Sequence, residues 1–260
     1  MRGLIIFLLL LSLNVCGQTY VASNSNPADG GSLASGSINT TMPGSAAAGD
    51  LIVAIVTTRN ATGTFGIGNP ANQTWNTLTP HQSSTATLSM GVFWCQYNGS
   101  VNGQTLNFTS SSSTSSSVVL HAFRPTSSSN VWGVDANTPS NGLHSFNAST
   151  GAINADPVGS WTPANNNSVS LAIWATDDDN TWGSLTGTGW VTTGSAQYRN
   201  TAGSDQSSSY AHRILTTAAS VANPSKTQAT LGGDPGIKGA FVFYEYTSTA
   251  LPRKVRMIID

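Results

Sequence analysis

Residues 51–60 of the chain read LIVAIVTTRN, and residues 169–178 read VSLAIWATDD. The first stretch opens on an almost continuous apolar run, which is typical of a β-strand covered on both faces. The second stretch alternates apolar and polar residues at its start, which is the period-2 pattern of a strand. Residues 54–60 are echoed by residues 172–178 at an offset of 118. The two stretches therefore predict a pair of related, buried strands.

Further matches between the two parts of the chain keep the same order. Residues 44–45 match residues 159–160, and Trp75 matches Trp190, both at an offset of 115. Residues 104–108 match residues 226–230, and residues 118–123 match residues 240–245, both at an offset of 122. Offsets that drift by a few residues are what changes in loop length produce. The sequence therefore predicts an internal duplication of about 118 residues, with half-repeats at about 44–124 and 159–246.

The predicted fold class is all-β. Residues 118–123 and 240–246 are rich in aromatic and β-branched residues, as half-buried strands are, and residues 92–97 and 105–108 also have strand character. Gly-, Asn- and Ser-rich turns separate these runs, and no stretch of 12 residues combines helical periodicity with capping signals. We therefore expect a jelly-roll-type β-sandwich.

Two arrangements of the half-repeats suit this pattern. Each half could form an immunoglobulin-sized sandwich, or the halves could interleave into one sandwich over residues 18–247, a size that all-β domains reach routinely. Because no proline-rich or charged linker separates the halves, we favour the single sandwich.

The composition limits the possible partners. Only 8% of the residues are charged, with 10 Lys and Arg against 11 Asp and Glu, whereas an ordinary globular protein has about 25%. Ser, Thr and Asn make up about 35% of the chain. Ten scattered cations do not form the basic face that nucleic acids require. We therefore expect no nucleic-acid partner and a neutral, hydrogen-bonding exterior, which suits polyhydroxylated partners or packing between subunits.

Residues 1–17 have the order of regions found in a secretory signal peptide. A positive charge precedes an apolar run at residues 4–13, and small residues precede Gln18. This run is too short to span a bilayer, so we expect cleavage before Gln18, a secreted or cell-surface location and no transmembrane anchor. Cys16 offers lipidation as an alternative, although Val15 stands where a lipobox has Gly, Ala or Ser.

The remaining cysteine, Cys95, lies within a strand-like run and cannot form an intrachain disulfide once the signal is removed. Free cysteines are among the most buried residues, so we expect Cys95 to fill the core.

A set of motifs runs through both half-repeats. They are an apolar strand that starts with Gly-Asp (residues 49–54), a turn around Trp75, an aromatic strand (92–94), a Thr/Ser-rich strand (106–109), a strand that closes with Arg124, and an Ala-Thr-Asp-Asp-Asp loop (175–179). Together they resemble a loosely defined group of exported or virion-associated, lectin-like β-sandwich proteins of bacteria and phages. The resemblance covers about residues 44–246 and implies no catalytic residues. The second half lacks the Gly-Asp pair and the final Arg.

Asp177, Asp178 and Asp179 form the only cluster of acidic residues, and Asn180 follows them. Carboxylate and amide oxygens are ligands that Ca²⁺ prefers, and adjacent like charges are unfavourable unless a cation or full solvation relieves them. The alternative is an exposed turn in which these side chains cap their own backbone. We expect the three aspartates to be the metal ligands and Ca²⁺ to be the cofactor.

Trp182 follows this acidic loop. An exposed tryptophan beside amide groups can stack on a sugar ring while the amide hydrogen-bonds to its hydroxyls. The alternative is that Trp182 packs inward, since tryptophan is highly buried on average. The expected ligand-binding residues are Trp182 and Asn180, and the expected ligands are glycans or other cell-surface polymers.

Catalytic motifs are missing from the sequence. The four histidines show no metal-type spacing, and neither a Gly-x-Ser-x-Gly elbow nor a His-Glu-x-x-His motif occurs. Glu245 is the only glutamate, and no second carboxylate is identified beside it for glycoside hydrolysis. We therefore expect a non-enzymatic surface protein that acts in adhesion or carbohydrate binding.

The alternative function is that of a structural subunit of a virion or an extracellular filament. Residues 248–260 form a basic and apolar tail whose last part could add a strand to a neighbouring subunit, or could be a frayed terminus. Self-association through sheet edges and this tail would support the structural reading.

Overall fold

The computed structural model describes residues 17–68, 73–83, 87–101, 103–111, 114–139, 142–229 and 233–248. These residues form β-strands and no α-helix, so the predicted all-β sandwich class is confirmed. The described part also contains no helix that is long and apolar enough to cross a membrane. Most of the expected signal peptide and of the C-terminal tail lies outside the described residues.

The strands form two consecutive sets. The N-terminal half holds β1 (Thr19–Asn26), β2 (Ser37–Thr41), β3 (Leu51–Thr58), β4 (Phe65–Ile67), β5 (Asn76–Ser83), β6 (Ser89–Gln96), β7 (Thr105–Ser110) and β8 (Ser116–Arg124). The C-terminal half holds β9 (Asn130–Val134), β10 (Leu143–Phe146), β11 (Ile153–Asn154), β12 (Ser168–Thr176), β13 (Val191–Thr192), β14 (Tyr198–Asn200), β15 (Gln206–Leu215), β16 (Ser225–Lys226) and β17 (Gly236–Thr247).

Each half builds a large sheet and a small sheet from its own strands. The N-large sheet has the order β1-β8-β3-β6-β5, and the N-small sheet has the order β2-β7-β4. The C-large sheet has the order β10-β17-β12-β15-β13, with β14 also paired to β15 and β9 to β17, and the C-small sheet pairs β11 with β16. No sheet contains named strands of both halves, which differs from the interleaved arrangement favoured from the sequence.

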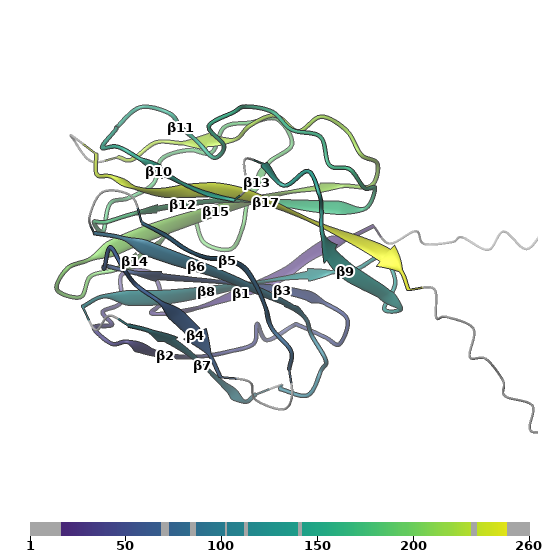
Figure 1. Cartoon of the computed structure of the whole chain (residues 1–260), viewed down its shortest axis with the longest axis horizontal. Coiled ribbons are helices and arrows are strands. Elements are labelled where there is room, and N and C mark those ends of the chain that lie inside the picture. Colours follow the sequence, from purple (N-terminus) through teal and green to yellow (C-terminus); the bar gives the residue numbers. More distant parts are fainter. Residues whose placement is uncertain are drawn as a thin grey trace, which may run out of the picture.

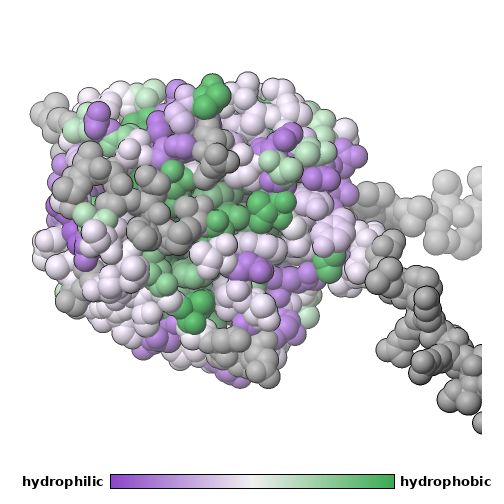
Figure 2. Space-filling view, viewed as in Figure 1, coloured by the Kyte–Doolittle hydropathy of each residue, from purple (hydrophilic) through white to green (hydrophobic). Residues whose placement is uncertain are grey.

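The four sheets stack as layers in the order C-small, C-large, N-large, N-small (Figure 1). The two large sheets lie face to face in the middle, so the halves form one body. Figure 2 shows apolar side chains reaching the surface along the seam between the large sheets, while most of this face is neutral or hydrophilic.

Three apolar clusters fill the spaces between the layers. The central core lies between the two large sheets, the N core between the N-large and N-small sheets, and the C core between the C-large and C-small sheets. Strand β3 is buried along its whole length because Leu51 faces the central core and Ile52 faces the N core. The apolar run at residues 51–56 is therefore a strand covered on both faces, as predicted. Cys95 is fully buried in the N core, as expected, and burial raises the pKa of its thiol.

The two halves follow the same order of pairing. In the N-large sheet β3 lies between β8 and β6, and in the C-large sheet β12 lies between β17 and β15. In the small sheets β7 pairs with β2, and β16 pairs with β11. This is a likeness of topology, and the internal duplication itself stays a prediction.

Candidate functional site

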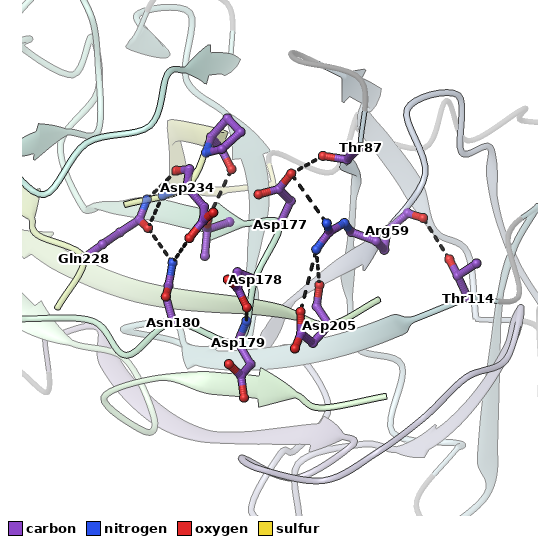
Figure 3. A network of polar contacts seen from close by, with 12 residues as sticks. Arg59, Thr87, Thr114, Asp177, Asp178, Asp179, Asn180, Asp205, Gln228 and Asp234 are labelled. Atoms are coloured by element: carbon purple, nitrogen blue, oxygen red, sulfur yellow. Dashed lines mark hydrogen bonds and ion pairs between the residues drawn. The ribbon is translucent and has the colours of Figure 1, made fainter. Parts of the chain in front are cut away.

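The acidic loop follows β12 and meets the N-terminal half across the two large sheets (Figure 3). Asp177 accepts a hydrogen bond from the Thr87 hydroxyl, and its Oδ2 atom lies 3.9 Å from Nη2 of Arg59. Arg59 follows β3, so it occupies the position that the sequence match relates to Asp177 at an offset of 118. Asp177 is largely buried, and these contacts tie one half of the molecule to the other.

Asp178 and Asp179 meet a third carboxylate, that of Asp205, and one oxygen of each lies within 4.8 Å of the others. Burial raises the pKa of Asp205, and the charge of Asp178, its hydrogen bond to Asp205 and the charge of Asp179 raise it further. Arg59 reaches the same group, since its Nη1 donates to the Asp205 carbonyl oxygen at 2.8 Å. Three half-buried carboxylates can supply several oxygen ligands to a hard cation, and Ca²⁺ at this cluster stays a prediction.

The sequence alone could not predict that Asp205 belongs to this cluster. It lies 26 residues beyond Asp179 and immediately before β15. Strands β12 and β15 are antiparallel, with Thr176 opposite Ser207, so the end of one strand lies beside the start of the other. Asp177, which the sequence grouped with its two neighbours, is instead engaged by Arg59 and Thr87.

Asn180 faces inward and takes part in a closed network (Figure 3). Its Nδ2 donates to Gln228 Oε1 at 2.7 Å and also to the Asp234 carboxylate. Gln228 in turn donates to the Asp234 carbonyl oxygen at 2.6 Å and accepts from the Asp234 N–H at 2.8 Å. Asn180 is almost fully buried, so its amide holds two loops together.

Trp182 lies in the C core with 6% of its surface exposed. Its indole N–H donates to the Ser207 hydroxyl at 3.0 Å, and its backbone N–H donates to Gln197 Oε1 at 3.0 Å. The ring therefore offers no exposed face on which a sugar could stack. The structure brings Trp182 and Asn180 into the protein interior.

A groove of about 400 Å³ opens at another part of the seam between the halves. This seam groove is lined by Gln73, Thr74, Asn76, Trp94, Gln96, Asn98, Val131, Trp132 and Tyr246. None of these described lining residues carries a charge. The N-terminal half supplies the wall around β5 and β6, and β9 and β17 supply the opposite wall, so the groove exists only because the halves pack together.

Aromatic rings of two kinds line the seam groove. Trp94 is half-buried and packs edge-on against Phe243 of the central core, with ring centroids 5.8 Å apart. Tyr246 is 47% exposed and lies 5.4 Å from the ring of Tyr244. Trp132 is buried, and its indole N–H donates to the Gly49 carbonyl oxygen at 3.0 Å. Trp94 and Tyr246 are therefore the rings that can meet a ligand.

The amide side chains of the groove are held in place by the backbone. Gln73 donates to the Gln96 carbonyl oxygen at 3.0 Å and accepts from the Asn98 N–H at 2.8 Å. Gln96 donates to the Asn130 carbonyl oxygen at 3.0 Å, which links β6 to β9. Asn76 is exposed at the rim. A wall positioned in this way needs little reordering when a ligand binds.

The sequence contained one signal for this groove. Trp94, Gln96 and Asn98 recur at every second position, which places them on one face of a strand and just beyond its end. From the sequence, Trp94 was expected only as part of an aromatic strand at residues 92–94. Only the packing of β9 and β17 against β6 turns this face into a groove, and that packing has no local signal.

None of the histidines whose side chains the structure describes, His121, His144 and His212, belongs to the acidic cluster or lines the seam groove. His121 and His212 lie in the interior between the large sheets, with His121 4.7 Å from the ring of Tyr210 and His212 5.2 Å from the ring of Tyr20. The side chain of His81 lies outside the described part. No protein-family model matches this chain, and no curated protein or solved structure matches it either.

Proposed function

We propose that this chain is an exported, non-enzymatic surface protein that binds neutral carbohydrate in the seam groove and thereby acts in adhesion. The observation that carries the proposal is the lining of that groove. The rings of Trp94 and Tyr246 stand among the amides of Gln73, Asn76, Gln96 and Asn98, with no charged side chain among the described lining residues.

The chemistry of this lining suits a sugar. Sugar rings have apolar C–H faces that pack on aromatic rings, and their hydroxyls both donate and accept hydrogen bonds. Amide side chains also donate and accept, and a site with aromatic walls and a few placed polar groups is the usual form of a small-molecule pocket. The half-buried ring of Trp94 and the exposed ring of Tyr246 supply the apolar contact.

The absence of charge in the described lining favours neutral sugars over acidic ones. A sugar carboxylate would lose part of its hydration in the groove without meeting a cation among these residues, and an unpaired charge is costly to desolvate. We therefore expect hexoses and their polymers to bind better than uronic acids or sialic acids.

Two further observations support the non-enzymatic and exported parts of the proposal. Glycoside hydrolysis uses two carboxyl groups that flank the bond to be cleaved, and the described lining of the groove contains none. The signal-peptide pattern of residues 1–17 supports export.

A glycan array tests the proposal. The purified chain is applied to neutral and acidic glycans beside Tyr246→Ala, which removes an exposed ring, and Val191→Ala, a control 55% exposed on β13. We expect binding to neutral glycans, unchanged in Val191→Ala and weakened about tenfold or more in Tyr246→Ala, as at an aromatic hot spot. Equal binding by both variants, or binding to acidic glycans alone, would contradict the proposal.

The alternative function, that of a self-assembling structural subunit, is tested by sedimentation. Residues 249–260 of the tail lie outside the described part of the structure. If the chain binds no glycan and sediments as a large assembly that deletion of residues 251–260 abolishes, the structural role replaces the proposed one.

A further inference from the structure

The outer face of the N-small sheet carries a regular array of uncharged polar side chains. On β2 the residues alternate between exposed and buried, and Ser37, Asn39 and Thr41 point outward. Their cross-strand partners on β7 are Thr109, Asn107 and Thr105. Since partners directly opposite in a sheet lie on the same face, the six side chains form one surface, here called the amide–hydroxyl face.

Hydrogen bonds within this face leave part of its capacity unused. Asn107 Nδ2 donates to Asn39 Oδ1 at 2.7 Å and to the Ser37 hydroxyl at 2.8 Å. An amide has two donor hydrogens and an acceptor oxygen. The Asn39 Nδ2 and Asn107 Oδ1 atoms have no protein partner among the described residues, so a donor and an acceptor stand side by side on the surface.

The face continues into a groove of about 240 Å³ between β1 and β2. Its described lining is Asn24, Ser25, Asn26, Asn39, Thr40, Thr41 and Thr105. Asn39, Thr41 and Thr105 therefore belong both to the groove and to the face. A ligand longer than one sugar could contact both without leaving the surface.

Two features limit what can occupy this surface. Asn24 donates to the Thr41 carbonyl oxygen at 2.9 Å, and Asn26 donates to that of Asn39, so the edge of β2 is already capped and cannot accept another strand there. The described residues of the face and its groove also include no large apolar or charged side chain, whereas the centre of a stable protein interface is rich in aromatic and apolar residues. A second copy or a peptide strand therefore fits poorly.

We propose that the amide–hydroxyl face and its groove form a second site, which takes an extended, neutral polysaccharide chain by hydrogen bonds alone. The ligand class rests on the proposed function, since the hydroxyls of a neutral polymer suit the uncharged polar side chains of this site as they suit the amides of the seam groove. The two sites differ in chemistry, because the seam groove adds aromatic rings and this one has none. Engagement of both sites by one polymer strengthens binding through effective concentration.

The test compares short and long ligands. Binding of the full chain to the neutral polysaccharides dextran, mannan and laminarin is measured by affinity electrophoresis, and binding to their hexasaccharides by calorimetry. The double variant Asn39→Ala/Asn107→Ala removes the amide pair from the surface, so it leaves the core intact. The control Thr188→Ala/Thr217→Ala makes two exposed polar changes outside both sites.

We expect the amide variant to bind the polysaccharide at least tenfold more weakly than the wild type, with unchanged affinity for the hexasaccharide in the seam groove. The control should match the wild type on both ligands. Polysaccharide binding by the amide variant that equals the wild type overturns the second site, while the proposed function stands.

The opposite outcome separates the two proposals. If Tyr246→Ala leaves hexasaccharide binding intact while the amide variant abolishes polysaccharide binding, the seam groove is wrong and the second site stands. If sedimentation shows that the amide variant splits a dimer while polysaccharide binding is unchanged, the face is a contact between copies and the second site is overturned.

Discussion

The two halves of the molecule share a strand order but fill their inner cores differently. The N core consists mainly of aliphatic and phenylalanine side chains under the three-stranded N-small sheet. The C core contains Trp161, Trp174, Trp182 and Trp190 under a C-small sheet whose strands are two residues long. The C-small sheet is too short to cover the C core by itself, and the large tryptophan rings fill the space that the longer strands of the N-small sheet cover in the other half.

The indoles of the C core also donate hydrogen bonds to main-chain carbonyl oxygens, one in β11 and one in a loop. Trp174 donates to the Ile153 carbonyl oxygen at 2.8 Å, and Trp190 donates to the Ala222 carbonyl oxygen at 2.7 Å. A tryptophan thus both fills space and donates a hydrogen bond to a main-chain carbonyl oxygen. The difference between the halves teaches that tryptophans in a Ser- and Thr-rich sandwich can be structural, as Trp182 is, and that the accessible ones lie elsewhere.

The largest expected effect on stability comes from a substitution in the C core. Trp174 is fully buried, so Trp174→Ala should lower the free energy of unfolding by about 3–5 kcal/mol. Val56, at the matching position of β3, is a smaller side chain in the N core, and Val56→Ala should cost about 1–3 kcal/mol. Urea unfolding measures both. Equal losses would contradict the different roles of the two cores.

The core shared by both halves predicts a loss of stability in acid. Burial lowers the pKa of His121 to about 3, assisted by the charge of His212, and burial lowers the pKa of His212 to about 4. Because the unfolded histidines bind protons near pH 6.5, the stabilisation is complete above that pH and is lost as the pH falls through about 4. Each histidine should lower the free energy of unfolding by on the order of 1.4 kcal/mol per pH unit in this range.

Unfolding midpoints in urea between pH 7 and pH 4 measure this slope. The ring nitrogens of His121 have no hydrogen-bond partner among the described residues, so His121→Leu should fold and should reduce the slope by about the share of one histidine. A slope that His121→Leu leaves unchanged would rule out His121 as a source of the acid sensitivity.

The acidic cluster gives an intermediate effect. Ca²⁺ at 100 times its dissociation constant should raise the free energy of unfolding by about 2.7 kcal/mol at pH 7, because it relieves the repulsion among Asp178, Asp179 and Asp205. Thermal unfolding with Ca²⁺ or EDTA measures the shift. Asp205→Asn should abolish it, and Asp177→Asn, an equal change of charge outside the cluster, should retain it. No shift in the wild type would remove Ca²⁺ as the cofactor.

The smallest expected effect on stability comes from the ion pairs that Arg59 of the N-terminal half makes with Asp177 and Asp205 of the C-terminal half. Arg59 is partly exposed and lies 3.9 Å from Asp177 and 3.8 Å from Asp205, so Arg59→Ala should lower the free energy of unfolding by about 1 kcal/mol or less. The loss should shrink further at high salt. A loss of several kcal/mol in urea unfolding would show that this contact, and not the central core, holds the halves together.

Much of the fold could be predicted from local patterns. The apolar run of β3, the alternation in β12 and the aromatic residues of β17 each identify a strand. The spacing of apolar residues along a strand shows whether one or both of its faces are buried. The sequence offered both separate and interleaved halves, and it could not decide between them because strand pairing depends on long-range contacts.

The candidate sites were also predictable only in part, because local patterns indicate residues but long-range packing decides which of them meet. The Asp-rich loop was visible in the sequence, but the third carboxylate of the cluster, Asp205, comes from the segment just before β15. Trp182 follows an acidic loop and Trp94 lies in an aromatic strand, but neither setting shows which ring is accessible. Only the packing of the layers buries Trp182 and leaves Trp94 in a groove. The face of a ring that meets solvent is a property of tertiary structure.

The most direct test of the account is the affinity of the chain for a neutral oligosaccharide selected on the array, measured by calorimetry for the wild type, Tyr246→Ala and Val191→Ala. We expect one class of site, an affinity about tenfold or more weaker in Tyr246→Ala, and no change in Val191→Ala. Equal affinities for all three proteins would contradict carbohydrate binding in the seam groove.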